Sequence, residues 1–311
     1  MTTQKTAKVA IVAAVVTASA AACLIGVSPS GATFRGDNGL LVYQAQAGKH
    51  IQLFTIRADG TGNRQITHLR HSDAISPEWS PDGRRIVFAR DYALGTRHEH
   101  LDIVTLNPNG SGLRGMGLRG LNGDPTWSPH GRILWVHPGG FAVSRAHGSG
   151  FRMLRVAGDN SSPTFSPDGR QIAFRRQLRG RRSAIFVVGA NGGRARRVVA
   201  PAGGVADKID WSPDGSRIVF SAPVFGQAGQ PSSNVFTIQP DGSGLRQLTH
   251  AQGGKVNNGA DSWSPDGKRI AFVSNPAGAY QIYVMNADGT DATAVTHTAP
   301  GGHLAAWGTH P

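Results

Sequence analysis

Apolar residues occur along this chain in short runs of consecutive positions. Four runs share the core [RQ]-I-[VA]-F: RRIVFAR (84–90), RQIAFRR (170–176), SRIVFSA (216–222) and KRIAFVS (268–274). After a loop of variable length, each is followed by a second apolar run: HLDIVTL (100–106), SAIFVVG (183–189), SNVFTIQ (233–239) and YQIYVMN (280–286). Apolar residues at consecutive positions are typical of strands that are covered on both faces. The pattern therefore predicts an all-β protein.

A turn motif, WSPDG or a variant of it, precedes these runs. Its copies start at Trp79, Trp127 (WSPHG), Phe165 (FSPDG), Trp211, Trp263 and, in a degenerate form (WGTHP), at Trp307. Proline sets φ for a turn, aspartate can accept hydrogen bonds from nearby backbone N–H groups, and glycine tolerates positive φ. The aromatic residues are 48, 38, 46, 52 and 44 positions apart, which fits a repeat of four short strands.

A second turn motif gives the number of repeats. An Asx-Gly or His-Gly pair occurs six times, at Asp59, Asn109, His147, Asn191, Asp241 and Asp288. The first of these precedes the first aromatic turn, and the last aromatic turn follows the last of these. We therefore expect a six-bladed β-propeller with four antiparallel strands per blade, closed by pairing of Leu304 to Trp307 with Gly39 to Gln44. Closure removes open sheet edges.

These repeats resemble the TolB-like propeller family, whose WD-like repeat is built around Pro-Asp. WSPDG with R-x-I-x-F, and the D-G-[ST]-G hairpin ending in R-x-[IL]-T, carry the resemblance over about Arg35 to Pro311. It implies the fold and says little about function. The periplasmic TolB protein has an additional N-terminal α/β domain, and similar propellers precede the hydrolase domain of prolyl-oligopeptidase-type enzymes. We expect neither domain in this chain, and therefore neither role.

The first 32 residues have the features of a signal peptide. Lys5 and Lys8 precede an alanine-rich apolar stretch, and Ser30-Gly31-Ala32 fits the small-x-small cleavage rule before Thr33. We therefore divide the chain into a signal peptide, 1–32, and a propeller, 33–311, that is secreted, periplasmic or attached to the cell envelope. Two alternatives stay open: an uncleaved membrane anchor, and lipidation at Cys23, the one cysteine, within Ala20 to Cys23.

The sequence contains no strong catalytic or metal-binding motif. No G-x-S-x-G motif occurs, and the serines of the Gly-Ser-Gly repeats belong to hairpin turns. The aspartates of the aromatic turn are expected to be structural, because His130 replaces one of them. His98-Glu99-His100 matches no zinc signature and is expected to be an exposed loop. We therefore expect no catalytic residues, no metal site and no cofactor, apart from a cation that the central channel could hold.

A small set of polar residues is expected at one mouth of the central channel. They precede their aromatic residues by four or five positions, which places them at the start of the innermost strands: Asn122, Asn160, Asp207, Asn258 and His303. Ordinary polar lining of a wet channel is one interpretation. A shallow site for a cation or a small polar ligand is the other.

Positive charge is unevenly distributed. The chain has a net charge of +13, or +11 without Lys5 and Lys8 of the leader. Nine arginines and no acid lie between Arg170 and Arg197, and five of them crowd one predicted loop: Arg175, Arg176, Arg179, Arg181 and Arg182. Such a patch attracts polyanions, although a generally basic surface would look similar. In an exported protein, anionic lipid or wall polymer is a more natural partner than nucleic acid.

The sequence thus predicts an exported, monomeric binding propeller whose partner is a protein or an anionic envelope component. The competing hypothesis is a propeller enzyme, a lyase or hydrolase acting on a polar or sugar ligand at the channel mouth. Such an enzyme needs convergent acidic or histidine side chains, and only Asp207 and His303 are offered there. Trp79, Trp127, Trp211 and Trp263 are expected to be buried between blades.

Overall fold

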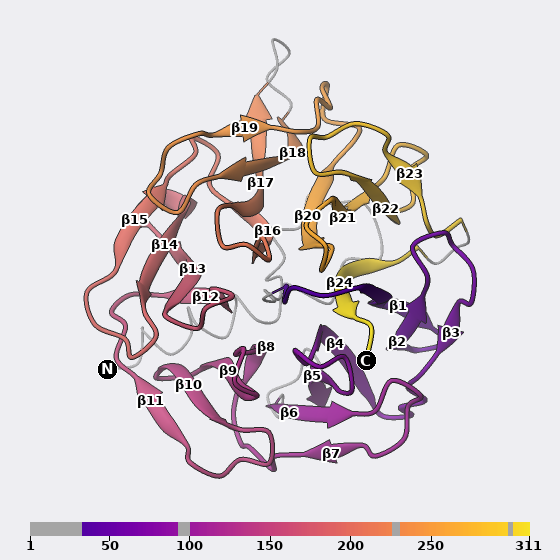
Figure 1. Ribbon diagram of the computed structural model, residues 1–311, viewed down its shortest axis with the longest axis vertical. Helices are drawn as coiled ribbons and strands as arrows, with labels where there is room; N and C mark the ends of the chain where they lie inside the picture. The colour runs from indigo at the N-terminus through magenta and orange to yellow at the C-terminus, as the bar shows by residue number, and fades with distance from the viewer. Residues whose placement is uncertain (1–32, 93–99, 226–230, 298–300) are drawn as a thin grey trace.

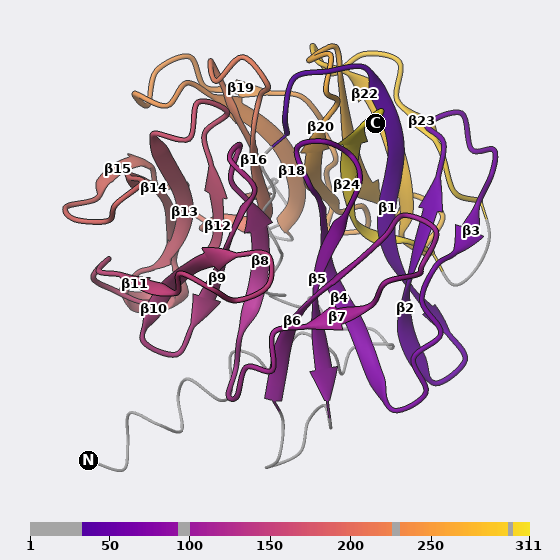
Figure 2. The same cartoon turned by 60° about the horizontal axis from the view of Figure 1, so that its bottom comes forward.

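The computed structural model describes residues 33–92, 100–225, 231–297 and 301–311, and these form six antiparallel sheets around a central axis (Figure 1). Each sheet has four strands. The same radial arrangement is visible when the ring is tilted (Figure 2). The predicted fold, an all-β propeller of six four-stranded blades, is therefore confirmed.

Each blade begins with its innermost strand at the axis and continues outward strand by strand. Blade 1 contains β24 (His303–Thr309), β1 (Asn38–Ala47), β2 (His50–Ile56) and β3 (Arg64–Gln65). Blade 2 contains β4 (Ser72–Trp79), β5 (Ile86–Tyr92), β6 (His100–Leu106) and β7 (Arg114–Gly115). Blade 3 contains β8 (Gly123–Trp127), β9 (Arg132–His137), β10 (Gly140–Arg145) and β11 (Arg152–Leu154).

Blade 4 contains β12 (Asn160–Phe165), β13 (Gln171–Gln177), β14 (Ser183–Gly189) and β15 (Arg196–Val199), with a short 3₁₀ helix η1 (Arg179–Arg181) between β13 and β14. Blade 5 contains β16 (Ala206–Trp211), β17 (Ile218–Phe225), β18 (Pro231–Ile238) and β19 (Arg246–Gln247). Blade 6 contains β20 (Asn258–Trp263), β21 (Arg269–Ser274), β22 (Gln281–Asn286) and β23 (Thr293–Ala294).

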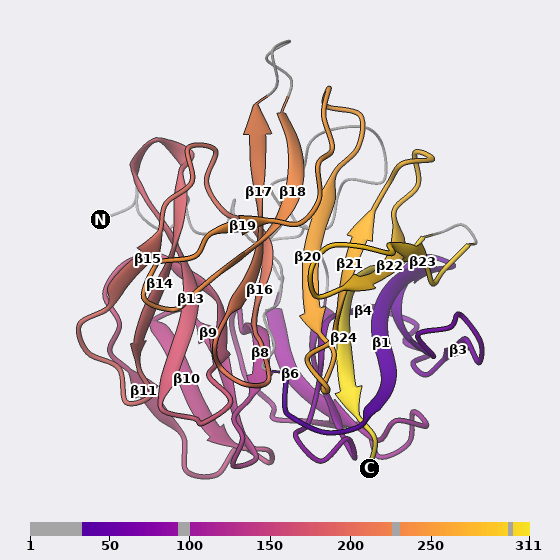
Figure 3. The ribbon, with the colours of Figure 1, turned by 45° about the horizontal axis from the view of Figure 1, so that its top comes forward.

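The C-terminal strand closes the ring as the offset of the two turn motifs predicts. β24 pairs antiparallel with β1, with Leu41 opposite Trp307 and Val42 opposite Ala306. Figure 3 shows the yellow β24 lying beside the indigo β1. Blade 1 is thus assembled from both ends of the propeller, which leaves its inner strand joined to the rest of the blade only by hydrogen bonds and packing.

The aromatic turn is held by its own side chains. In blade 2, Ser80 Oγ donates to Asp82 Oδ1 at 2.6 Å, and the backbone nitrogen of Arg84 donates to the same oxygen at 3.1 Å. The turns of blades 4, 5 and 6 repeat the serine–aspartate bond at 2.6 Å. The aspartates therefore stabilise the turn, as expected from the replacement at His130.

Three inner strands contain a proline within an irregular register. Pro77, Pro125 and Pro163 each lie at a break in the pairing with the second strand of the blade. The residues before them have positive φ, 63° at Ser76, 48° at Asp124 and 50° at Ser162. Proline is tolerated there because the bulge already interrupts the ladder.

The hydrophobic core is divided among the six junctions between neighbouring blades, one buried cluster per junction. The aromatic residues of the turn motif belong to these clusters, as predicted. The four tryptophans are between 2 and 5% exposed: Trp79, Trp127, Trp211 and Trp263. Phe165 takes the same place in blade 4.

Arginines of the outer strands link four of the blades to the hairpin turn of the next blade. In four blades the first outer-strand residue donates an Nη hydrogen bond to that turn: Arg64 to Asn109 O, Arg152 to Asn191 Oδ1, Arg196 to Pro240 O and Arg246 to Asp288 O. The hairpin glycines also fit closely at these contacts. A Cβ on Gly110, which has φ 88°, would collide with the carbonyl oxygen of Ile66.

Residues 1–32, which carry the predicted signal peptide and Cys23, lie outside the described residues. Within the described part of the chain, no helix is long and apolar enough to span a bilayer.

Candidate functional site

Two of the asparagines predicted at the channel mouth stabilise loops. Asn122 is fully buried, and its Nδ2 donates to the carbonyl oxygens of Leu101, Arg119 and Gly120 at 3.1 to 3.2 Å. Asn160 Nδ2 donates in the same way to three carbonyl oxygens of the loop before β12. These side chains hold the chain as it enters an inner strand, so their polar atoms are already engaged.

The other predicted mouth residues differ among themselves. Asn258 begins β20 and is buried, with its Nδ2 3.4 Å from Asn234 Oδ1. His303 begins β24, is exposed, and packs its ring against Tyr280 at a centroid distance of 4.9 Å. Asp207 lies in β16, but its side chain is outside what the structure describes. The sequence pattern thus placed these residues correctly at or beside the starts of the inner strands. Those of their side chains that the structure describes contact different loops and do not form one ligand site.

A charged cluster that the sequence analysis missed lies in the middle of the ring. Lys208 of β16 forms an ion pair with Glu78 of β4, and blades 2 and 5 are opposite each other. The Lys208 ammonium also donates to the carbonyl oxygen of Ala305 at 3.2 Å. Lys208 is fully buried and Glu78 is 4% exposed. Instead of a wet channel, the axis at this level holds a buried salt bridge.

Asp210 extends this cluster toward blade 6. Its Oδ2 accepts the backbone N–H of Trp263 at 2.9 Å and the hydroxyl of Thr33 at 2.5 Å. Burial raises the pKa of Asp210 to about 7, although Lys208 acts in the opposite direction. Burial likewise raises the pKa of Glu78, against the attraction of the Lys208 ammonium. One signal was available in the sequence, since Glu78 and Asp210 occupy the same repeat position, directly before the blade aromatic residue.

Another buried carboxylate, that of Asp124, lies at the junction of blades 3 and 4. Asp124 Oδ2 accepts the backbone N–H of Ser162 at 3.0 Å. Burial raises the pKa of Asp124 to about 7, while the hydrogen bond from Ser162 and the positive charge of Arg175 act to lower it. Arg175 is therefore the partner charge of this carboxylate.

The five arginines predicted as one exposed patch are divided by the structure. Arg175 and Arg176 lie in β13 and not in the loop, which corrects the prediction: Arg175 is only 7% exposed, and Arg176 packs its guanidinium over Phe186 at 4.3 Å. Arg179 and Arg182 are exposed beyond the end of β13, and Arg181 lies in η1. Within the described side chains, two arginines of the set are thus free to meet a partner.

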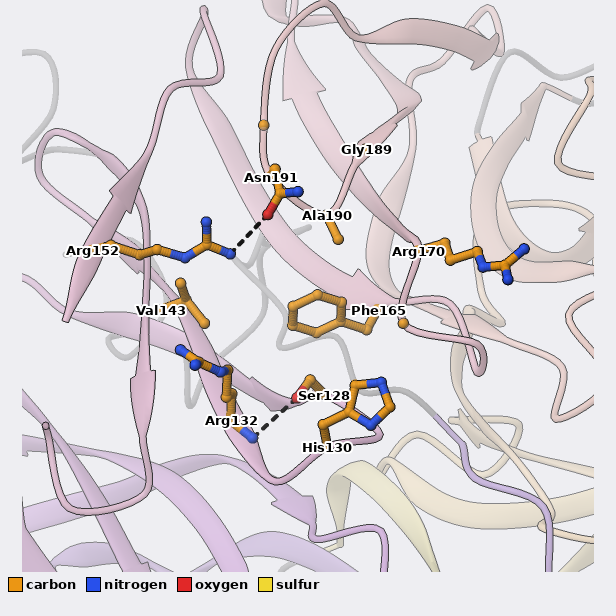
Figure 4. Close-up of a pocket in the computed structure, with 12 residues that line it drawn as sticks. Ser128, His130, Arg132, Val143, Arg152, Phe165, Arg170, Gly189, Ala190 and Asn191 are labelled. Carbon is orange, nitrogen blue, oxygen red and sulfur yellow. Dashed lines mark hydrogen bonds between the residues drawn. The ribbon is translucent and has the colours of Figure 1, made fainter. Parts of the chain in front are cut away.

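A basic crevice lies between blades 3 and 4, at the end of the ring formed by the turns. It has a volume of about 480 Å³, and Phe165 and Val143 lie at its centre with Arg132 and Arg152 beside them (Figure 4). Arg170 and His130 complete its basic lining, although the Arg170 side chain points away from the cavity. None of the described residues that line it is acidic. Asp168 approaches Arg170 at 3.9 Å, with both side chains exposed. The arrangement suits an anion.

No group of three or more histidine, cysteine, aspartate or glutamate side chains within the described residues is arranged to hold a metal ion. Of the segment His98-Glu99-His100, only His100 is described, and its ring stacks on Tyr92 at 4.4 Å.

Comparisons with known proteins agree with this architecture. A family model described as the TolB beta propeller domain matches residues 161–308. The crystal structure of TolB from Acinetobacter baumannii superposes with a TM-score of 0.71 at 19% identity, covering 88% of this chain and 67% of that one. A chain of the nidogen/laminin complex gives a TM-score of 0.64 at 12% identity, covering 86% of this chain and 98% of that one.

A curated relative, dipeptidyl-peptidase 5 of Porphyromonas gingivalis, is 38% identical over 72 residues. That segment is 23% of this chain and 10% of the peptidase, so this chain matches only about a tenth of that relative's length. The structural similarities, at less than 25% identity, concern the fold alone.

Proposed function

We propose that this chain, a TolB-like six-bladed β-propeller, is an exported, non-catalytic binding protein that engages an anionic component of the cell envelope. The predicted signal peptide, residues 1–32, supports the location, and the excess of Lys and Arg over Asp and Glu supports the anionic partner. A fold of this kind does not specify a function by itself. The binding role must therefore come from the surface of this particular ring.

The basic crevice between blades 3 and 4 carries the proposal. Arg132 and Arg152 both belong to blade 3 and flank an apolar floor that includes Phe165. Guanidinium groups bind phosphate and carboxylate oxygens through paired N–H donors, and such charge-assisted bonds are about twice as strong as neutral ones. Arg152 already donates to Asn191 Oδ1, which orients its guanidinium at the rim. A phosphate, sulfate or carboxylate group of a polymer or lipid fits this lining.

The enzyme hypothesis receives less support. An acid–base pair must be reached by its substrate, and the carboxylates near the axis, Glu78 and Asp210, are buried and bonded to Lys208 and Thr33. The side-chain amides of the predicted mouth residues Asn122 and Asn160 already donate hydrogen bonds to backbone carbonyl oxygens. We therefore assign the ring a binding role.

Three double variants that each remove two positive charges test the proposal. R132Q/R152Q removes them from the crevice. R85Q/R114Q removes them from the same repeat positions one blade earlier, and R179Q/R182Q removes them from the opposite end of blade 4. Binding to inorganic polyphosphate and to vesicles containing phosphatidylglycerol is measured at several salt concentrations.

R132Q/R152Q should weaken binding at least about tenfold, because each charge-assisted hydrogen bond contributes about 1.5 to 3 kcal/mol and 1.4 kcal/mol is tenfold. The other two variants should change it only slightly. Binding should also fall as salt rises from 0.1 M to 1 M, since the Debye length shrinks from about 10 Å to about 3 Å. Equal losses in all three variants would point to a diffuse basic surface and reject the crevice.

A further inference from the structure

Thr33 is inserted into the middle of the ring. Its side chain and backbone are 1% exposed, and Figure 1 shows the indigo start of the described chain near the axis. The backbone nitrogen lies 3.1 Å from Asp210 Oδ1, and the hydroxyl donates to Asp210 Oδ2 at 2.5 Å. Ser262 Oγ and the carbonyl oxygen of Trp263 are each 3.1 Å from the same hydroxyl. One residue thus joins the inner strands of blades 5 and 6.

The charges around Thr33 do not balance while its nitrogen is an amide. Asp210 and Glu78 are two buried carboxylates, and Lys208 is the one cation bonded to either of them among the described residues. A buried carboxylate without a compensating charge is destabilising or takes up a proton. A second positive charge next to Asp210 would correct this imbalance.

The sequence provides that charge at the required atom. Ser30-Gly31-Ala32 fits the small-x-small rule for cleavage directly before Thr33. We propose that the peptide bond between Ala32 and Thr33 is hydrolysed and that the new α-ammonium of Thr33 forms a buried ion pair with the Asp210 carboxylate. Water divides the C–N bond, so that Ala32 leaves with a carboxylate and Thr33 retains the nitrogen, which is protonated to the ammonium.

This pairing couples processing to assembly of the ring. Because Thr33 is buried in the folded propeller, a protease acts on the bond before it only while the axis is still open. Cleavage therefore precedes insertion, and insertion links blades 5 and 6 beside the Lys208–Glu78 pair that spans the ring. The new N-terminus thus holds blades 5 and 6 together from inside the ring.

Periodate oxidation tests whether the mature terminus is buried. Periodate cleaves the bond between the amine-bearing and hydroxyl-bearing carbons of an N-terminal threonine, releasing acetaldehyde and leaving a glyoxylyl group that mass spectrometry detects. The exported protein should begin at Thr33 and resist periodate while folded, and should react after denaturation. D210N should become reactive under native conditions, whereas D214N, in an exposed turn of the same blade, should stay protected. A different N-terminus, such as Met1 or an acylated Cys23, would overturn the proposal.

A thermodynamic cycle tests whether the ammonium itself matters. Chains beginning at Thr33 are compared with chains that retain Ala32 as one additional residue, each with Asp or Asn at position 210. In the Asp210 chain the additional residue should lower Tm by on the order of 10 °C, as expected for the loss of a buried ion pair. In the D210N chain the same addition should have a much smaller effect.

If the extension and D210N lower Tm by amounts that simply add in the double variant, the ion pair is rejected. Should D210N fail to fold, T33S and T33V complete the test in the Asp210 chain. T33S keeps both the ammonium and the hydroxyl and should match the wild type. T33V keeps the ammonium alone and should still lose Tm when Ala32 is restored. If restoring Ala32 leaves the Tm of T33V unchanged, the contact with Asp210 depends on the hydroxyl and not on the ammonium, and the proposal is rejected.

Discussion

Asp124 and Asp210 are two buried aspartates of inner strands, and burial raises the pKa of each to about 7, but their charges are compensated in different ways. The carboxylate of Asp124 is stabilised from the adjacent blade, by the N–H of Ser162 and the positive charge of Arg175. Asp210 likewise accepts an N–H from the adjacent blade, that of Trp263, but it also contacts Thr33 and lies near Lys208, whose ion-pair partner Glu78 comes from the opposite blade. The first arrangement needs two neighbouring repeats, whereas the second needs a closed ring.

This difference predicts that the cluster around Asp210 contributes more to global stability. A contact between adjacent repeats survives as long as the two repeats stay folded. The ion pair between Lys208 of blade 5 and Glu78 of blade 2 joins opposite blades, so it exists only when the whole ring is assembled. Variants at the two sites should therefore differ in the size and in the pH dependence of their effects.

The largest effect is expected for K208M. The variant leaves Glu78 and Asp210 buried without the cation between them, so the free energy of unfolding should fall by about 3 to 5 kcal/mol. Denaturant unfolding measures the change, and K268M, at an exposed lysine of blade 6, is the control. Adding E78Q to K208M should recover part of the loss. A K208M protein as stable as K268M would show that the pair across the ring carries no stability.

A smaller effect, with a distinctive pH dependence, is expected for D124N. The folded-state pKa of Asp124 is about 7 and its ordinary value is 3.8, so between these the folded protein binds more protons than the unfolded chain. Stability contributed by Asp124 is therefore lost as pH rises from about 4 to 7. D124N should reduce the difference in unfolding free energy between pH 5 and pH 8 by about 1 to 3 kcal/mol.

Asparagine suits position 124, because it tolerates the positive φ of 48° there and can still accept the N–H of Ser162. Unfolding free energies at pH 5 and pH 8 give the result directly. In the chain that begins at Thr33, D210N should leave the contribution of Asp124 to this pH dependence unchanged, since the two aspartates lie at different blade junctions. A D124N profile parallel to that of the wild type would assign the dependence to other groups.

The fold was predictable from the sequence because it is repeated. Six copies of each turn motif indicated the number of blades, and the offset between the two series predicted that Leu304 to Trp307 pairs with Gly39 to Gln44, as observed. Each copy confirms the others, so a degenerate copy such as WGTHP at Trp307 could still be placed. The buried state of Trp211 and its equivalents followed from the same periodicity.

The charged cluster was not predictable in the same way, because the lysine at position 208 is not repeated in the other blades. Three residues before the aromatic residue, the other blades have Ser76, Asp124, Ser162, Ala260 and Leu304, so no other copy has a cation there. Its partner Glu78 is 130 residues away in sequence and is brought near only by ring closure. The burial of Arg175 was missed for a related reason, since its partner charge, Asp124, belongs to the neighbouring blade.

The smallest effect on stability is expected for R179Q/R182Q. Both side chains are exposed beyond the end of β13, and exposed charges contribute little to folding, so the free energy of unfolding should change by less than about 0.5 kcal/mol. R175Q, a few residues earlier on the same blade, should be clearly destabilising at pH 8, because it leaves Asp124 ionised without its cation. That loss should shrink at pH 5, where Asp124 is protonated. If R175Q and R179Q/R182Q change the free energy of unfolding equally at both pH values, Arg175 is not the partner of Asp124. The conclusion that the adjacent blade compensates the charge of Asp124 is then wrong.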